Sequence, residues 1–171
     1  VLVSKKKNLF NFKKKTKKIL AKLYKKINFS NKYYVHRDYH SQNLIKFNKK
    51  IGVIDTQDAL IGNPAYDLVS LIDDPRIKTS KKLKQQIFKY YLKKSPLINK
   101  HNLNKFQEDF NILSVQRSLK IIGIFSRLFK RDKKNNYLKL IPYTWKILEM
   151  RMSPEIFSDL KLIFDKNINK N

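Results

Sequence analysis

Residues 33–55 constrain the fold most, because a polar loop there lies between short apolar segments. Residues 33–35 (YYV) predict a short buried strand, and the polar loop 36–43 follows it. Residues 44–54 then predict a β-hairpin with two apolar strands. Asp55 comes directly after the second strand. This order predicts that polar side chains gather at the open end of the hairpin.

The register of the hairpin decides which of these side chains meet. A three-residue turn at residues 48–50 places Asn43 directly opposite Asp55. Directly opposed Cβ atoms in antiparallel strands lie about 4.5–5.5 Å apart, so both side chains can reach one hard cation through oxygen. Asp38, on the preceding loop, would lie beside them. We therefore expect a carboxylate, an amide and a second carboxylate to converge there.

The loop itself has a known catalytic pattern. His36, Arg37 and Asp38 are followed, four residues further on, by Asn43, which matches the H-R-D-x4-N catalytic loop of kinases. In that loop the Asp accepts or orients the proton of the acceptor hydroxyl, and the Asn binds magnesium. We expect His36 and Arg37 to brace the loop through hydrogen bonds. A chance motif in a polar turn is the alternative, and the strand, hairpin and Asp55 around it disfavour that reading.

Charge along the chain gives a second indication. The net charge of +26 by itself favours a polyanionic partner such as nucleic acid or an anionic membrane. Lysine is spread along nearly the whole chain, however, and is enriched together with Asn, Ile, Phe and Tyr, as in A/T-rich genomes. We therefore do not expect specific nucleic-acid binding. Six of the 13 acidic residues lie within residues 38–74, which indicates a cation site or a chance surface cluster: Asp38, Asp55, Asp58, Asp67, Asp73 and Asp74.

Several classes of protein are disfavoured. The chain has no cysteine, which excludes disulfide frameworks and thiolate metal sites. No apolar run approaches the roughly 18 residues of a membrane span, and the N-terminus lacks the order of a signal peptide. A soluble cytoplasmic protein is the expectation. The first residue is Val1, so we expect a preceding part to be missing.

The rest of the chain predicts helices. Residues 12–27 have helical apolar spacing with a lysine-rich outer face, and Asp67 can cap a helix over 68–72. Gly62 and Pro64 indicate a loop. The chain is therefore predicted to be α+β and mostly helical, with the apolar helix at 103–130 central. The expected later helices are 80–94, 103–130, 136–150 and 154–166.

Three stretches carry a resemblance to a known family: YVHRDYHSQNLI, IGVIDTQDALIGNPAYDLVSLIDD and QRSLKIIGIFSRLFKRDKKNNYL. They resemble the aminoglycoside phosphotransferase family, whose fold is that of a protein kinase. Within it the chain is most similar to the bacterial kinases that phosphorylate the anomeric hydroxyl of N-acetylmuramate and N-acetylglucosamine. The third stretch lies outside the general kinase signature and points to this branch. Thr56 replaces the aromatic residue usual in the branch.

The resemblance implies roles for individual residues. Asp38 would be the catalytic base, while Asn43 and Asp55 would hold Mg²⁺ on the phosphates of ATP. Ile45 and Ile54 would pack under the adenine. Asp67 would brace the catalytic loop, with a plain helix N-cap as the alternative. On the acceptor side, Gln57 and Asp58 would face the sugar. The long helix at 103–130 adds three further candidates, for which a structural role is at least as plausible: Gln116, Arg117 and Lys120.

One half of a kinase is not found in this sequence. Its glycines, Gly52, Gly62 and Gly123, are too far apart to form the loop that covers ATP phosphates. We therefore expect residues 1–171 to form the C-terminal catalytic lobe, as a fragment or a truncated product. The predicted reaction is ATP- and Mg²⁺-dependent phosphorylation of an amino sugar in cell-wall recycling. The alternatives are a kinase of another small acceptor (aminoglycoside, choline or homoserine) and a basic binding protein without catalysis.

Overall fold

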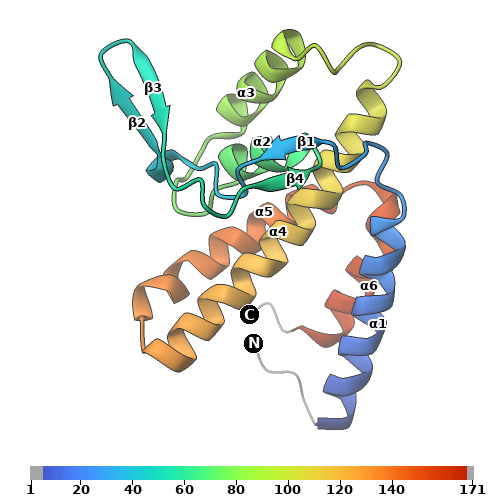
Figure 1. Ribbon diagram of the computed structural model, residues 1–171. Helices are drawn as coiled ribbons and strands as arrows, with labels where there is room; N and C mark the ends of the chain where they lie inside the picture. The colour runs from blue at the N-terminus through green and yellow to red at the C-terminus, as the bar shows by residue number, and fades with distance from the viewer. Residues whose placement is uncertain (1–5, 169–171) are drawn as a thin grey trace.

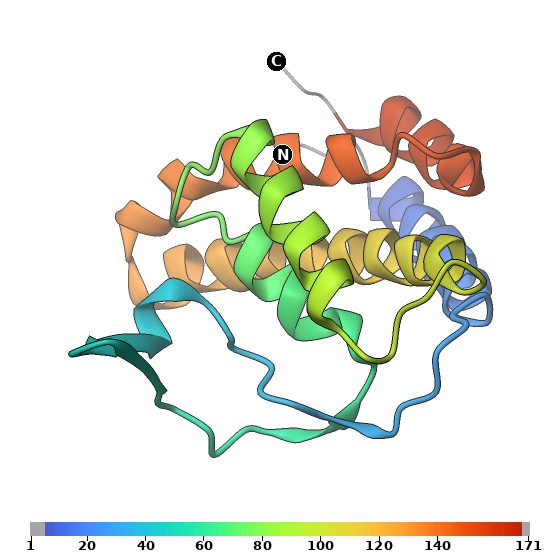
Figure 2. The same cartoon turned by 90° about the horizontal axis from the view of Figure 1, so that it is seen from above.

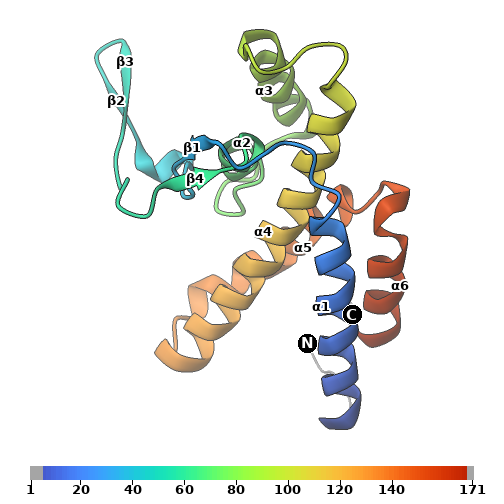
Figure 3. The same cartoon turned by 45° about the vertical axis from the view of Figure 1, so that its right-hand side comes forward.

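A long helix, α4 (Leu103–Asp132), runs through the middle of the protein in the computed structural model, which describes residues 6–168 (Figure 1). Helix α5 (Ile141–Arg151) packs along α4. Helices α1 (Lys6–Tyr24) and α6 (Ser158–Asn167) lie side by side, as Figures 1 and 3 both show. Helices α2 (Ala65–Ile72) and α3 (Lys81–Lys94) pack at the other end of α4.

Two small antiparallel sheets complete the fold. Strand β1 (Tyr33–Val35) pairs with β4 (Leu60–Gly62), and β2 (Leu44–Phe47) pairs with β3 (Lys50–Val53). The β2–β3 hairpin projects away from the helices, whereas the β1–β4 pair lies close to them (Figures 1 and 2). A 3₁₀ helix, η1 (Ser41–Asn43), leads from the polar loop into β2. The architecture is the predicted mostly helical α+β fold.

Helix α4 contributes to both parts of the hydrophobic core. One core cluster joins α4 to α1, α5 and α6, and includes Val115 of α4 and Leu148 of α5. The other joins α4 to α2 and α3, and includes Phe106 and Phe110 of α4. All four side chains are at most 1% exposed. Because one helix supplies side chains to both clusters, the predicted central position of α4 is confirmed.

The predicted helices exist, but several of their ends differ. Helix α3 begins after Ser80, whose hydroxyl accepts a hydrogen bond from the Leu83 amide at 3.2 Å, and it ends before Pro96. The helix predicted over 12–27 begins earlier, at Lys6, and ends at Tyr24. The last two predicted helices each begin with a 3₁₀ segment: η2 (Asn135–Leu140) precedes α5, and η3 (Glu155–Phe157) precedes α6.

Strand β4 (Leu60–Gly62) was not predicted, and the prediction of a loop is wrong at Gly62, which is the last residue of this strand. The strand pairs Gly62 with Tyr33 and Leu60 with Val35. A Cβ atom on Gly62 would lie 3.0 Å from Val35 Cγ2. Glycine is therefore suited to this position because it allows a close approach between the strands.

The outer faces of the helices are polar. In α1, Leu23 is buried while Lys13, Lys17 and Lys18 are exposed. Lysine stems can cover apolar surface while their charges stay in water. Within residues 6–168, none of the helices combines the length and apolarity that crossing a membrane requires.

Candidate active site

A ring of hydrogen bonds joins the polar loop to the hairpin. Asn43 Nδ2 donates to the Asp38 carbonyl at 3.0 Å, and the Ile54 amide donates to the Asn43 carbonyl at 3.1 Å. The ring closes where His36 Nε2–H donates to the Ile54 carbonyl at 2.9 Å. Asp55 follows Ile54 directly. The loop and the open end of the hairpin therefore form one unit, in which the backbones of Asp38, Asn43 and Asp55 lie close together.

The register of the hairpin differs from the prediction. Leu44 pairs with Val53 and Phe47 with Lys50, so the turn contains two residues instead of three. The predicted direct opposition of Asn43 and Asp55 is therefore wrong by one residue. The turn begins with Asn48 at φ 52°, a left-handed conformation that asparagine tolerates well.

Asp55 takes its position from a break in the strand. A shift of one residue would turn a side chain to the opposite face of the hairpin if the strand continued. Asp55 instead has φ 68°, a left-handed conformation outside the extended region. The strand ends at Val53, and Asp55 lies just beyond it. Its Oδ1 accepts a hydrogen bond from Gln57 Nε2 at 2.5 Å.

Helix α2 holds the start of the polar loop through a carboxylate. Asp67 Oδ2 accepts from the His36 amide at 2.7 Å, and Asp67 Oδ1 accepts from the Arg37 amide at 2.9 Å. Arg37 has φ 75°, and such a conformation is uncommon and costly in a residue other than glycine. Pro64 occupies the N-cap position of α2, so the alternative that Asp67 is an N-cap is wrong.

The donor set at the end of the hairpin fits a hard cation. Because Asn43 Nδ2 donates to the loop backbone, its amide group has Oδ1 left to offer, and Asp55 adds an exposed carboxylate. Mg²⁺ is commonly bound by one or two such oxygens together with substrate phosphates and water. In the part of the chain that the structure describes, no three His, Cys, Asp or Glu side chains form a group that could hold a metal. The protein would thus supply an amide and a carboxylate.

The acidic residues predicted to form one cation site serve different purposes. Asp67 binds the amides of the loop, as described above. Asp73 is buried and ion-paired with Lys84 at 2.8 Å, and Asp74 is ion-paired with Arg76 at 3.0 Å. The interpretation of a single acidic cluster is therefore wrong for these three residues.

The hairpin presents apolar side chains outward. Ile45 is 49% exposed and Ile54 is 46% exposed, although both belong to an apolar ribbon. Phe47, near the turn, is 72% exposed. Nothing within residues 6–168 covers these side chains, so they form an open apolar surface beside Asp55.

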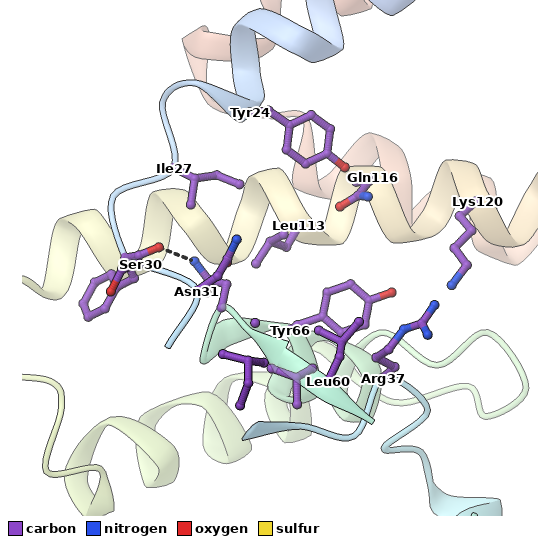
Figure 4. A pocket seen from close by; sticks show the side chains of 15 residues that line it. Tyr24, Ile27, Ser30, Asn31, Arg37, Leu60, Tyr66, Leu113, Gln116 and Lys120 are labelled. Carbon is purple, nitrogen blue, oxygen red and sulfur yellow. Dashed lines mark hydrogen bonds between the residues drawn. The ribbon is translucent and has the colours of Figure 1, made fainter. Parts of the chain in front are cut away.

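A cavity of about 660 Å³ lies on the other side of the loop (Figure 4). It lies between the end of α1, the β1–β4 pair and α4. The loop contributes Arg37 to its lining, and α4 contributes Gln116 and Lys120, which are four residues apart and share one face of the helix. Its other polar lining side chains include Tyr24, Ser30, Asn31, Asn63 and Tyr66.

Three predicted site residues lie outside this cavity. The exposed Gln57 binds Asp55, and the Asp58 carbonyl accepts from Arg37 Nη1 at 3.1 Å. Arg117, next to Gln116 on α4, is only 5% exposed. Burial lowers the pKa of Arg117, as does the charge of Arg76, while Tyr66, Asp74 and Asp38 oppose that shift.

His40 is a residue of the loop that sequence reasoning assigned no role. Its amide donates to the Asp38 carbonyl at 2.9 Å, and its carbonyl accepts from the Asn43 amide at 2.9 Å. Burial lowers the pKa of His40, and the charge of Arg76 adds to this, so the neutral imidazole is favoured. The place of His40 within the HRDYHSQN segment is the sequence feature that could have indicated a role for it. No local sequence pattern marks the cavity residues from α1 and the linker that follows it as part of a site.

Comparison with known proteins identifies the family. The model of the phosphotransferase enzyme family (APH) matches residues 8–101. An N-acetylmuramate/N-acetylglucosamine kinase of Caulobacter vibrioides is 31% identical over 140 residues, covering 79% of this chain and 38% of the relative. A protein of the same name from Neisseria meningitidis is 39% identical over 65% of this chain and 34% of its own length. The Pseudomonas aeruginosa protein of the same name is 36% identical over 72% of this chain and 38% of its own length.

The chain therefore belongs to the aminoglycoside phosphotransferase family of kinase-like phosphotransferases, as its motifs predict. The matched region spans between 34% and 38% of the length of these curated relatives. The range matched by the family model includes the loop and the hairpin.

Proposed function

We propose that this chain is the catalytic lobe of an ATP- and Mg²⁺-dependent phosphotransferase that acts on the anomeric hydroxyl of an amino sugar. The observation that supports this most is the ring of hydrogen bonds through His36, Asp38, Asn43 and Ile54. This ring supports the proposal because Asp38 would act as the base, and Asn43 and Asp55, which follows Ile54 directly, would bind the metal. Phosphoryl transfer requires mainly such positioning and charge neutralisation.

On the nucleotide side, Asn43 Oδ1 and the Asp55 carboxylate would hold Mg²⁺. When bound, ATP would supply the phosphoryl group, and Mg²⁺ would offset the negative charge of the phosphates. The exposed apolar side chains of Ile45 and Ile54 would contact the adenine ring. Since both side chains are about half exposed, burial against a planar ring would remove apolar surface from water.

On the acceptor side, the Asp38 carboxylate would accept the proton of the hydroxyl as its oxygen attacks. The loop that carries Asp38 is held by Asp67 of α2, which accepts from the His36 amide. It is also joined to the end of the hairpin, because the His36 ring donates to the Ile54 carbonyl. Gln57 and Asp58, just past Asp55, stay candidates for contacts with the acceptor. The cavity lined by Arg37 and Gln116 adjoins the same loop and offers a place for the rest of the acceptor.

The sugar assignment rests on the relatives, which are named as kinases of N-acetylmuramate and N-acetylglucosamine. The role in cell-wall recycling and the cytoplasmic location stay predictions. Choline, homoserine and aminoglycosides are the competing acceptors, because an acceptor pocket can change without any change in the loop or hairpin.

A substrate panel tests this proposal. The complete coding product that contains these residues is incubated with ATP, Mg²⁺ and each acceptor, and phosphorylated products are identified by mass spectrometry. We expect phosphate on N-acetylmuramate or N-acetylglucosamine, none on their 1-O-methyl glycosides, and no product after chelation of Mg²⁺. Transfer to choline, homoserine or an aminoglycoside but to neither sugar would contradict the sugar assignment.

Replacing Asp67 with asparagine tests how α2 supports the loop. Asparagine has one amide oxygen and cannot accept from both the His36 and Arg37 amides without turning an NH₂ group toward a donor. Losing a charge-assisted hydrogen bond costs about 1.5–3 kcal/mol, so kcat should fall about ten- to hundredfold. Asp159→Asn, on the exposed face of α6, is the matched control. An unchanged kcat would exclude a supporting role for Asp67.

A further inference from the structure

Two cations line the cavity. Among the residues that the structure describes, Arg37 and Lys120 are the charged ones in its lining, and none of the lining residues is acidic. Figure 4 shows the ends of both side chains directed toward the same part of the cavity, near the hydroxyl of Tyr66. The ion pairs found within residues 6–168 involve neither of them. Two positive charges are thus directed into one space without a carboxylate to offset them.

The position of Arg37 is fixed by the surrounding fold. Its amide is held by Asp67, and its carbonyl accepts from Ser70 Oγ at 3.4 Å. Its guanidinium donates once, from Nη1 to the Asp58 carbonyl at 3.1 Å. A neutral carbonyl leaves the positive charge in place, and a guanidinium has five N–H donors, so further donors remain for a ligand. Arg37 is therefore a partly preorganised anion-binding group.

Lys120 reaches the same space from α4. It lies one helical turn after Gln116, and both line the cavity. Its exposed ammonium has three donors on a flexible stem, so it can adjust to a bound group. Two cations that approach each other repel, and an anion between them replaces this repulsion with two attractions. The site is consequently more favourable for an anion than for a neutral or cationic group.

We propose that Arg37 and Lys120 bind a carboxylate on the acceptor, so that an acidic sugar is bound in preference to its neutral counterpart. This inference rests on the proposed function and adds a charge requirement to it. A carboxylate fits because its two oxygens match the planar fork of a guanidinium. The same arrangement disfavours polycationic aminoglycosides as acceptors.

N-acetylmuramate and N-acetylglucosamine test this directly, since N-acetylmuramate is the same sugar with an added carboxylate-bearing ether group. Their dissociation constants are measured by calorimetry on the complete coding product. We expect the wild type to bind the acidic sugar about five- to tenfold more tightly, and Lys120→Gln to reduce this preference to about twofold or less. Lys130→Gln, on the same helix but outside the cavity, should keep it. Because Lys120 is exposed, the preference should also weaken as salt is added.

The outcomes separate the inference from the proposed function. Equal binding of the two sugars, binding of neither, or a preference that survives in Lys120→Gln would overturn the inference. Phosphate transfer to both sugars with no carboxylate preference would overturn the inference and keep the proposed function. A preference that depends on Lys120, in a protein that transfers phosphate to neither sugar, would support the anion site and overturn the proposed function.

Discussion

Replacing Asp38 with asparagine is expected to lower kcat about 10²–10⁴-fold, the usual contribution of a positioned general base. Asparagine has nearly the same size but cannot accept the proton of the acceptor hydroxyl. The loop should keep its conformation, because the hydrogen bonds from Asn43 and His40 end on the backbone carbonyl of Asp38 and not on its carboxylate. The effect should therefore be on chemistry and not on folding.

Steady-state kinetics on the complete coding product measure this effect, with nucleotide affinity measured separately by a fluorescent ATP analogue. Nucleotide affinity should stay within about twofold, since the base does not contact the phosphates in the ground state. Asp159→Asn again serves as the control, because Asp159 is exposed on α6. A kcat within tenfold of wild type would refute the assignment of Asp38 as the base.

Sequence reasoning succeeded where the signal was local. The strand before His36 is marked by its apolar run, although of its residues only Val35 is buried as predicted. Helix α3 is marked by Ser80 before it and Pro96 after it. The polar loop was recognised as a unit from the spacing of Asp38 and Asn43, and the hydrogen bond between these two residues confirms that they lie together. Each of these features depends on a few neighbouring residues, whose backbone preferences and capping groups act over short distances.

The hairpin register shows where a local signal was insufficient. Turns of two and three residues both fit the polar segment after Phe47, and they differ by one residue in register. The choice depended on Asn48 adopting a positive φ. No Asn-Gly or Asp-Gly pair, the strongest signal for a two-residue turn, was present to indicate this.

Contacts between distant segments were not predictable from one sequence. Asp109 on α4 accepts from the Asn28 amide at 2.8 Å, the Phe29 amide at 2.9 Å and Asn63 Nδ2 at 2.9 Å. These bonds hold the linker after α1 against α4 and thereby shape the cavity of Arg37 and Lys120. Asp109 lies in a helical segment and is separated from Asn28 by 81 residues, so its pattern in the sequence is that of an ordinary polar helix position.

Replacing Asp73 with alanine is expected to destabilise the fold by about 3–5 kcal/mol, because it leaves the buried Lys84 and the partly buried Arg151 without their acid. Asp73 is 3% exposed and ends α2. It accepts from Lys84 Nζ of α3 at 2.8 Å, Ser114 Oγ of α4 at 2.7 Å and Arg151 Nε of α5 at 2.8 Å. One carboxylate thus connects four helices. At about 2–4 °C per kcal/mol for a chain of this size, the melting temperature should fall by roughly 10 °C.

The loss of stability in Asp73→Ala should depend on pH, whereas a loss caused only by a cavity would not. Burial alone would raise the pKa of Asp73, but the charges and hydrogen bonds of Arg151 and Lys84 outweigh it and lower the pKa. The stabilisation by Asp73 is therefore complete above the unfolded-state pKa of about 3.9 and is lost as the pH falls below it toward the folded-state pKa.

Urea unfolding of wild type and Asp73→Ala should accordingly show a difference in the free energy of unfolding that narrows below about pH 4. The matched control is Asp132→Ala, which removes a surface ion pair with the exposed Arg131 and should change the stability little at any pH. A difference between wild type and Asp73→Ala that is small at pH 7, or that does not narrow in acid, would show that the charge of Asp73 does not hold these helices together.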